Sequence, residues 1–194
     1  MSGTAPFPTA ADLVSLGRPV LALAALLAFR EHPFALVVSL AAVLLLDILD
    51  GWLARRRASS RHGAFIDLIG DRLVELTVLF TYAAWGWLPW AIGAIFLIRG
   101  ILTDTIRVQN ARYPDPAFAH PLSVGGADSR FWRAAVNGSK IAAFVLVPLG
   151  WQAGGLDLGL AAAWLAVAVN LRRGLPVILS RRGRALLRRL VASS

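Results

Sequence analysis

Four aspartates lie close together in the stretch DILDGWLARRRASSRHGAFIDLIGD, which runs from Asp47 to Asp71. Asp47 and Asp50 are three residues apart, and Asp67 and Asp71 are four apart. Because residues at these separations share one face of a helix, each half of the stretch would present two carboxylates side by side. Apolar runs flank it, LVVSLAAVLLL before and LVELTVLF after. The acids therefore fall where helices suited to a membrane begin or end.

Four carboxylates in a partly apolar site cannot all ionise without opposing charge. We expect divalent cations, two in number, to supply that charge. Oxygen-only ligands suit Mg²⁺ or Mn²⁺, and two such ions can clamp a phosphoryl group in transfer. The small residues Gly51, Ala54 and Gly63 would let a bulky ligand approach the backbone, and Arg55 is the nearest cation for a phosphate.

The composition indicates a membrane protein. Of 194 residues, 57% are hydrophobic and 16% charged, and the mean hydropathy is +0.64. Soluble domains of this length carry more charge. In so apolar a chain, the net charge of +9 suits basic loops on anionic lipid headgroups better than nucleic acid. The chain has no cysteine, which excludes disulfides and thiolate metal sites.

The apolar runs predict an all-α polytopic membrane protein with about six transmembrane helices, since a spanning helix needs ~20 apolar residues. No run alternates with the period of a strand. We expect residues 1–194 to form a single membrane domain, with a short N-terminal segment 1–12 and a basic amphipathic tail 181–194 on the membrane surface. The predicted helices span about 13–29, 33–56, 64–86, 87–109, 131–152 and 157–179.

The basic residues predict the orientation. With six spans, one side collects the arginines of 55–61, Arg112, Arg130 and the arginines of the tail, whereas the other side has Arg30 and little else. The positive-inside rule then places both termini and the aspartates on the cytoplasmic side of the inner membrane.

The spacing of these residues resembles the signature of the CDP-alcohol phosphatidyltransferases. The pattern reads Asp-x-x-Asp-Gly-x-x-Ala-Arg from Asp47 to Arg55, followed by Gly-x-x-x-Asp-x-x-x-Asp from Gly63 to Asp71. Every fixed position matches, and the six-span layout agrees. The resemblance implies a membrane enzyme that displaces CMP from a CDP-linked donor with an alcohol, and it implies a homodimer.

The resemblance also implies roles for single residues. Asp47, Asp50 and Asp67 would hold metal, and Asp71 would contact metal and take the proton of the acceptor hydroxyl. The CDP site would be lined by Gly51, Ala54, Arg55 and Gly63. The donor we expect is CDP-diacylglycerol, which gives phosphatidyl transfer.

Basic residues outside the motif bear on the acceptor. IRGILTDTIR resembles the fourth helix of phosphatidylglycerophosphate synthases, and SRFWRAAVNGSK resembles the basic start of the fifth helix there and in the inositol-phosphate group. The chain departs from the glycerol-phosphate pattern at Asn137–Ile141, where a Gly-Lys-x-Lys-Thr-like stretch is usual. We expect Arg107, Arg133 and Arg172 to bind a phosphorylated acceptor such as glycerol 3-phosphate or inositol phosphate. Anchoring of helix ends would explain the same arginines.

Other interpretations stay open from the residues alone. An enzyme of this family could instead transfer a CDP-linked headgroup to a lipid alcohol. A divalent-cation or proton-coupled transporter would also hold acids within a membrane, although usually at midplane. A non-catalytic scaffold is the third. Of the remaining charges, Arg18 could face the headgroups or the substrate, and we expect it to snorkel to the headgroups. We expect Glu75 to pair with Arg72 or Arg99.

Overall fold

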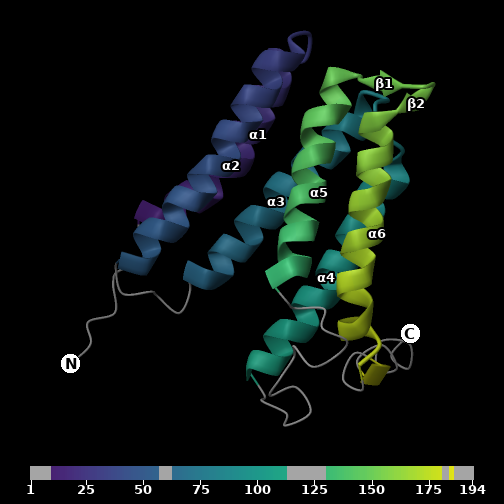
Figure 1. Ribbon diagram of the computed structural model, residues 1–194. Coiled ribbons are helices and arrows are strands. Elements are labelled where there is room, and N and C mark those ends of the chain that lie inside the picture. Colours follow the sequence, from purple (N-terminus) through teal and green to yellow (C-terminus); the bar gives the residue numbers. More distant parts are fainter. Residues whose placement is uncertain (1–9, 57–62, 113–129, 181–183, 186–194) are drawn as a thin grey trace. The chain divides into compact units, whose positions relative to one another are not determined.

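The computed structural model describes residues 10–56, 63–112, 130–180 and 184–185, and at 10–12, 47–56, 63–65, 67, 107–112, 130 and 133 it describes the backbone alone. Six long helices make up most of this part, which confirms the all-α prediction (Figure 1). They are α1 (Ala10–Phe29), α2 (Pro33–Arg56), α3 (Gly63–Ala84), α4 (Trp90–Arg112), α5 (Arg130–Leu149) and α6 (Leu158–Ile178). Their bounds follow the predicted ranges to within a few residues.

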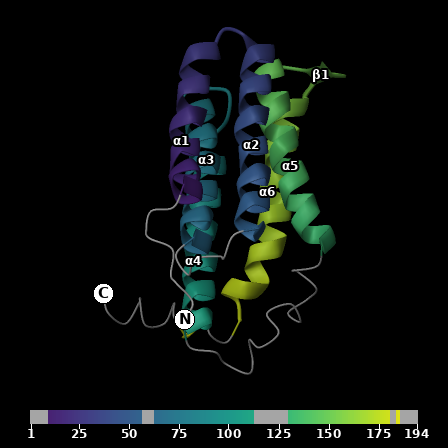
Figure 2. The ribbon, with the colours of Figure 1, turned by 90° about the vertical axis from the view of Figure 1, so that its left-hand side faces the viewer.

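The chain divides into two compact units, Met1–Pro89 and Trp90–Ser194. In the first unit, α1 packs against both α2 and α3 (Figure 2). Helix α3 carries a buried stripe of Ile66, Gly70, Val74 and Val78, and Gly70 of this stripe lies against α1. Residues four apart share a face, so this stripe fixes which side of α3 is turned inward. Asp71 directly follows Gly70 of the stripe, and its own side chain is exposed.

In the second unit, α6 packs against α4 and α5. A small hairpin joins α5 to α6, with strands β1 (Gln152–Ala153) and β2 (Leu156–Asp157). Its two-residue turn is Gly154–Gly155, and both glycines have positive φ, as the tight turns favoured in hairpins require. Asp157 then caps α6 by accepting a hydrogen bond from the backbone N–H of Leu160. The sequence has no alternation of apolar and polar residues that would predict these two-residue strands. The expectation of no strand was therefore wrong here.

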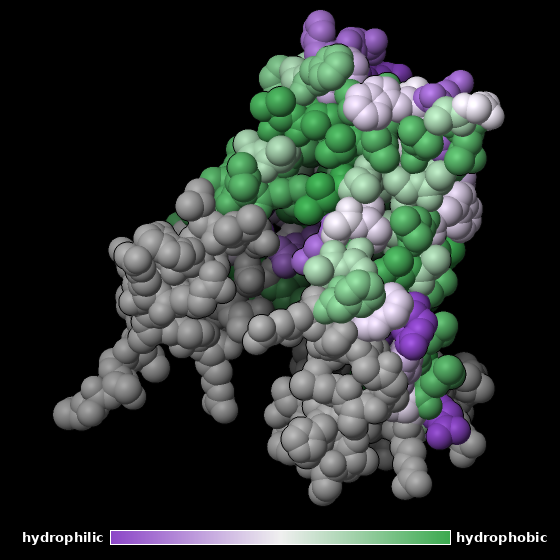
Figure 3. Space-filling model, viewed as in Figure 1, coloured by the Kyte–Doolittle hydropathy of each residue, from purple (hydrophilic) through white to green (hydrophobic). Residues whose placement is uncertain are grey.

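Helix α1 exposes an apolar stripe that a helix of a soluble protein would bury. Its exposed stripe is apolar, with Leu13, Leu16, Val20, Leu23 and Leu27 each at least 43% exposed. Its buried side includes the polar residues Ser15 and Arg18. Figure 3 shows hydrophobic residues over much of the described surface in that view, with hydrophilic ones at the top, in the middle and low on the right. Such outward leucines suit a lipid environment, because contiguous apolar surface on a soluble monomer is rare.

By length and composition, α6 is the one helix within the described ranges that could cross a membrane. Shorter apolar stretches occupy Leu13–Phe29, Pro33–Leu46 and Ala134–Leu149. The count of six spans therefore stays a prediction, as does the description of 1–194 as one membrane domain. Most of the predicted amphipathic tail lies outside the described residues.

Candidate active site

The two halves of the acidic motif lie on consecutive helices. Asp47 and Asp50 belong to the second half of α2, and Asp67 and Asp71 to the first turns of α3. The backbone is helical through both pairs, so the predicted spacing does put each pair on one helix face. Residues 57–62 join the two acid-bearing helix ends, which brings both to the same end of the first unit (Figure 1).

Three of the four aspartate side chains lie outside the described part, as do the side chains of Gly51, Ala54, Arg55 and Gly63. Asp71 is the aspartate whose carboxylate the structure describes. Among the described side chains, no group of three or more His, Cys, Asp or Glu residues could hold a metal ion. The four-aspartate metal site therefore stays a prediction, and the donor set itself, carboxylate oxygens only, suits a hard divalent cation.

The carboxylate of Asp71 forms an ion pair with Arg18 of α1. Nη2 of Arg18 lies 3.1 Å from Oδ1 of Asp71, with the arginine side chain 2% exposed and the aspartate side chain 50% exposed. Arg18 therefore does not snorkel, and that expectation was wrong. Ion pairing explains the outcome, since a buried guanidinium needs an anion, and Asp71 provides one at the edge of the helix interface.

A close helix contact makes this ion pair possible. A Cβ added at Gly70 would lie 2.6 Å from the carbonyl oxygen of Ser15 and 3.2 Å from Nη2 of Arg18. Pro19 of α1 has no N–H, so it cannot donate the helical hydrogen bond to the carbonyl of Ser15. That carbonyl is the group against which Gly70 packs. Glycine at position 70 thus lets α1 approach α3 closely enough for Arg18 to reach Asp71.

The next acid along α3, Glu75, is paired within its own helix. Nη1 of Arg72 lies 2.9 Å from Oε2 of Glu75, whose side chain is 6% exposed. This confirms the expected pairing with Arg72. Glu75 is thereby tied to a neighbour one turn away, whereas Asp71 is tied to a different helix and keeps half of its side chain open.

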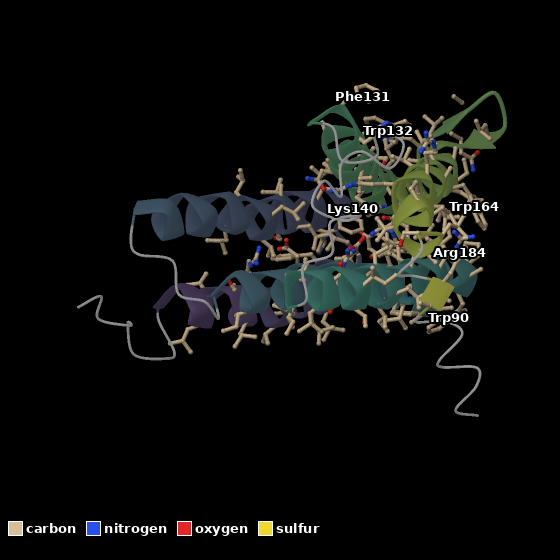
Figure 4. All side chains as sticks on the ribbon, turned by 90° about the horizontal axis from the view of Figure 1, so that it is seen from below. Trp90, Phe131, Trp132, Lys140, Trp164 and Arg184 are labelled. Atoms are coloured by element: carbon tan, nitrogen blue, oxygen red, sulfur yellow. The ribbon has the colours of Figure 1, made fainter. Side chains whose placement is uncertain are left out.

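The residues predicted to bind the acceptor belong to the second unit. The side chains of Arg107 and Arg133 lie outside the described part. Arg172 is exposed, and its guanidinium lies over the ring of Trp132, 5.3 Å from the centroid. Trp132, labelled in Figure 4, extends from the first turn of α5. The tryptophan holds the guanidinium by a cation–π contact, which leaves the charge accessible. Convergence of the three arginines stays a prediction.

The second unit also buries polar residues to which the sequence analysis gave no role in the site. Arg99 of α4 is 4% exposed, and its aliphatic carbons lie about 3.0 and 3.1 Å from where a Cβ on Gly174 would stand. One turn on, Thr103 is fully buried and donates its hydroxyl to the carbonyls of Arg99 and Gly100. Asn170 of α6 is 1% exposed. In an apolar helix, a polar residue recurring every third or fourth position was the available signal.

The family model of the CDP-alcohol phosphatidyltransferases matches residues 8–172. The chain belongs to this family. The match covers all four aspartates, the four small or basic motif residues and the three predicted acceptor arginines. Comparisons with curated proteins and with solved structures gave no match.

Membership makes the protein a transferase, as the motif predicted. CDP-alcohol phosphatidyltransferases transfer a phosphatidyl group or a headgroup from a CDP-alcohol to an alcohol, and they are embedded in membranes. They generally use divalent metal ions, which agrees with the carboxylate donor set of α2 and α3. Arg18 is the residue of this site that the motif did not include. Its signal was a cation three residues from Ser15 in an otherwise apolar helix.

Proposed function

We propose that the protein transfers a phosphatidyl group from CDP-diacylglycerol to a small phosphorylated alcohol, and releases CMP. The observation that carries the proposal is the complete motif on the consecutive helices α2 and α3, which the family match includes. Glycerol 3-phosphate and inositol phosphate are the acceptors that the basic residues of the second unit favour.

The residues of the motif are proposed to have two roles, metal binding and CDP binding. Asp47, Asp50, Asp67 and Asp71 would hold two divalent ions, Mg²⁺ or Mn²⁺, through oxygen ligands alone. When bound, these ions neutralise the diphosphate and stabilise CMP as a leaving group. Gly51, Ala54 and Gly63 carry no side chain larger than a methyl group, so the CDP moiety can approach the helix backbone. Arg55 supplies a fixed cation for a phosphate oxygen.

Asp71 is proposed as the general base. The acceptor hydroxyl is a poor nucleophile near neutral pH, and a carboxylate within hydrogen-bond reach can remove its proton during attack. The acceptor oxygen forms a bond to the phosphorus that carries diacylglycerol, the bond to the bridging oxygen of CMP breaks, and CMP leaves with that electron pair. The half-exposed side chain of Asp71 leaves a substrate room to approach.

The acceptor phosphate needs cations away from the aspartates. Arg172 supports this role most directly, because its guanidinium is exposed and held against Trp132. A planar guanidinium can bind a phosphate through two parallel hydrogen bonds. Arg107 and Arg133 are proposed to complete the anion pocket.

The proposed enzyme acts as a homodimer in the inner membrane, with the active site and both termini on the cytoplasmic side. The distribution of arginines between predicted loops supports the orientation. The donor lipid would enter from the membrane with its CDP head toward the aspartates.

Release of CMP from CDP-diacylglycerol tests the proposal. Purified protein in detergent with Mg²⁺ is given glycerol 3-phosphate, inositol phosphate, inositol, serine or no acceptor in parallel. We expect release that depends on one phosphorylated acceptor. Release with unphosphorylated inositol or serine alone would contradict the acceptor class while leaving phosphatidyl transfer intact. Movement of Mn²⁺ into liposomes without any release would favour a transporter instead.

A further inference from the structure

We propose that Arg18 is a positioning residue for the reaction: it holds the carboxylate of Asp71 in the orientation that metal binding and proton transfer require. The inference rests on the proposed function, which gives Asp71 both tasks. The ion pair joins a side chain that is 2% exposed to one that is 50% exposed, with Nη2 and Oδ1 3.1 Å apart. Arg18 therefore lies behind the carboxylate, on the protein side, while the carboxylate remains open to ligands.

The place of Arg18 on its helix argues against a role in anchoring. An arginine that served only to anchor α1 would reach the headgroups from the exposed side, as long basic side chains do near membrane surfaces. Leucines and valines occupy that side of α1. Arg18 instead lies on the buried side, with Ser15 one turn earlier and Ala22 one turn later. Burying a guanidinium is costly, and an ionisable group within a membrane protein most often has a functional partner.

The local backbone is shaped for this contact. Gly70 comes directly before Asp71, and a Cβ there would stand 3.2 Å from Nη2 of Arg18 and 2.6 Å from the Ser15 carbonyl oxygen. Glycine inside a helix costs about 1 kcal/mol relative to alanine. The absence of a side chain at Gly70 leaves the space that the guanidinium of Arg18 needs to reach the carboxylate of Asp71.

A second ion pair on α3 involves another arginine. Arg72 and Glu75 are on the same helix, and their side chains meet at 2.9 Å one turn apart. Glu75 is almost fully buried, as expected for a purely structural pair. Asp71 differs, because its partner comes from α1 and half of its own side chain stays open.

The expected effect follows from the geometry of a guanidinium. Its planar donors fix the plane of a carboxylate, which an ammonium on a flexible stem does less well. Partners that orient a metal-binding side chain typically contribute 10–100-fold to metal affinity or activity. We therefore expect Arg18→Met to lower kcat by roughly 10–100-fold and to weaken Mn²⁺ binding, with Arg18→Lys between Arg18→Met and the wild type.

The test uses full-length protein in detergent and two readouts. The first is kcat for CMP release from CDP-diacylglycerol, calculated per folded molecule. The amount of folded protein is taken from the monodisperse peak in size-exclusion chromatography. The second is Mn²⁺ binding without substrate, followed by electron paramagnetic resonance of the free ion. Arg72→Met is the matched control, because it removes the cation of the adjacent ion pair on the same helix. A merely structural role predicts that both methionine variants change thermal stability and leave both readouts near wild type.

The results for the Arg18 and Arg72 variants support or overturn the role of Arg18. Loss of kcat and of Mn²⁺ affinity in Arg18→Met but not in Arg72→Met supports the inference. Equal behaviour of the two variants in both readouts overturns it, even if the wild type is active. If Arg18→Met yields no monodisperse protein, Arg18→Lys decides: wild-type values for both readouts overturn the inference. A wild type that releases no CMP refutes the proposed function, whereas the Mn²⁺ titration still tests Arg18.

Discussion

Gly70 of α3 packs against the backbone of Ser15 in α1, so closely that an added Cβ would stand 2.6 Å from the serine carbonyl oxygen. Gly70→Ala must therefore push the two helices apart. We expect a loss of roughly 1–3 kcal/mol in stability, the usual cost of overpacking a tight contact. We also expect lower CMP release, since Arg18 and Asp71 would separate. Thermal unfolding in detergent and the release assay measure the two effects.

Gly17→Ala is the control for this substitution. Gly17 lies in α1 next to Arg18, and a Cβ there would meet nothing within 4 Å. Alanine favours a helix over glycine, so this variant should be neutral or slightly more stable. Equal stability of the two alanine variants would contradict the close contact.

Much of the fold could be predicted from the sequence, because apolar runs of helix length bounded by polar loops admit few alternatives. All six helices lie where the runs predicted them. The acidic pairs could also be placed, since spacing alone fixes the face of a helix. The pairing of Arg18 with Asp71 could not, because it depends on which helix packs against α3. No pattern within the segment SLGRPV indicates that α1 packs against α3, nor that Ser15 and Arg18 face inward.

Asp71→Asn should separate chemistry from folding. An amide cannot take the proton of the acceptor hydroxyl, so CMP release should fall by about 10²–10⁴-fold. The amide oxygen can still accept a hydrogen bond from Arg18, although the buried guanidinium loses its anion, so the melting temperature should fall only moderately. Asp71→Leu removes the anion and the acceptor together and should lower the melting temperature further. Near-normal turnover of Asp71→Asn would rule out Asp71 as the base.

Gly159 plays a similar packing role in the second unit. A Cβ at this position would lie 2.7 Å from Cα and 2.9 Å from N of Val147, where α6 begins against α5. Gly159→Ala should lower the melting temperature through strain at that contact. Gly138→Ala, in the open part of α5, should not. A Gly159→Ala protein as stable as Gly138→Ala would show that the α5–α6 contact is looser than described.

Arg172 can be tested against a second arginine in the same chemical setting. Arg30 lies over Trp85 at 5.3 Å, as Arg172 lies over Trp132. Arg172→Ala should raise KM for a phosphorylated acceptor by roughly tenfold, as expected from loss of a charge-assisted hydrogen bond, and leave KM for CDP-diacylglycerol unchanged. Arg30→Ala should change neither constant. Identical kinetics for both variants would reduce Arg172 to an anchor of the helix end.

Transfer of a phosphatidyl group from CDP-diacylglycerol is tested most directly by comparing two kinds of donor and acceptor with the same purified protein. One reaction holds CDP-diacylglycerol with glycerol 3-phosphate and inositol phosphate, and the other holds CDP-choline and CDP-ethanolamine with diacylglycerol. Mass spectrometry follows the lipid product together with CMP, with and without EDTA. We expect one phosphatidyl product per CMP in the first reaction, lost with EDTA and restored by Mg²⁺ or Mn²⁺. A lipid product from the second reaction alone, or turnover that resists EDTA, would contradict this expectation.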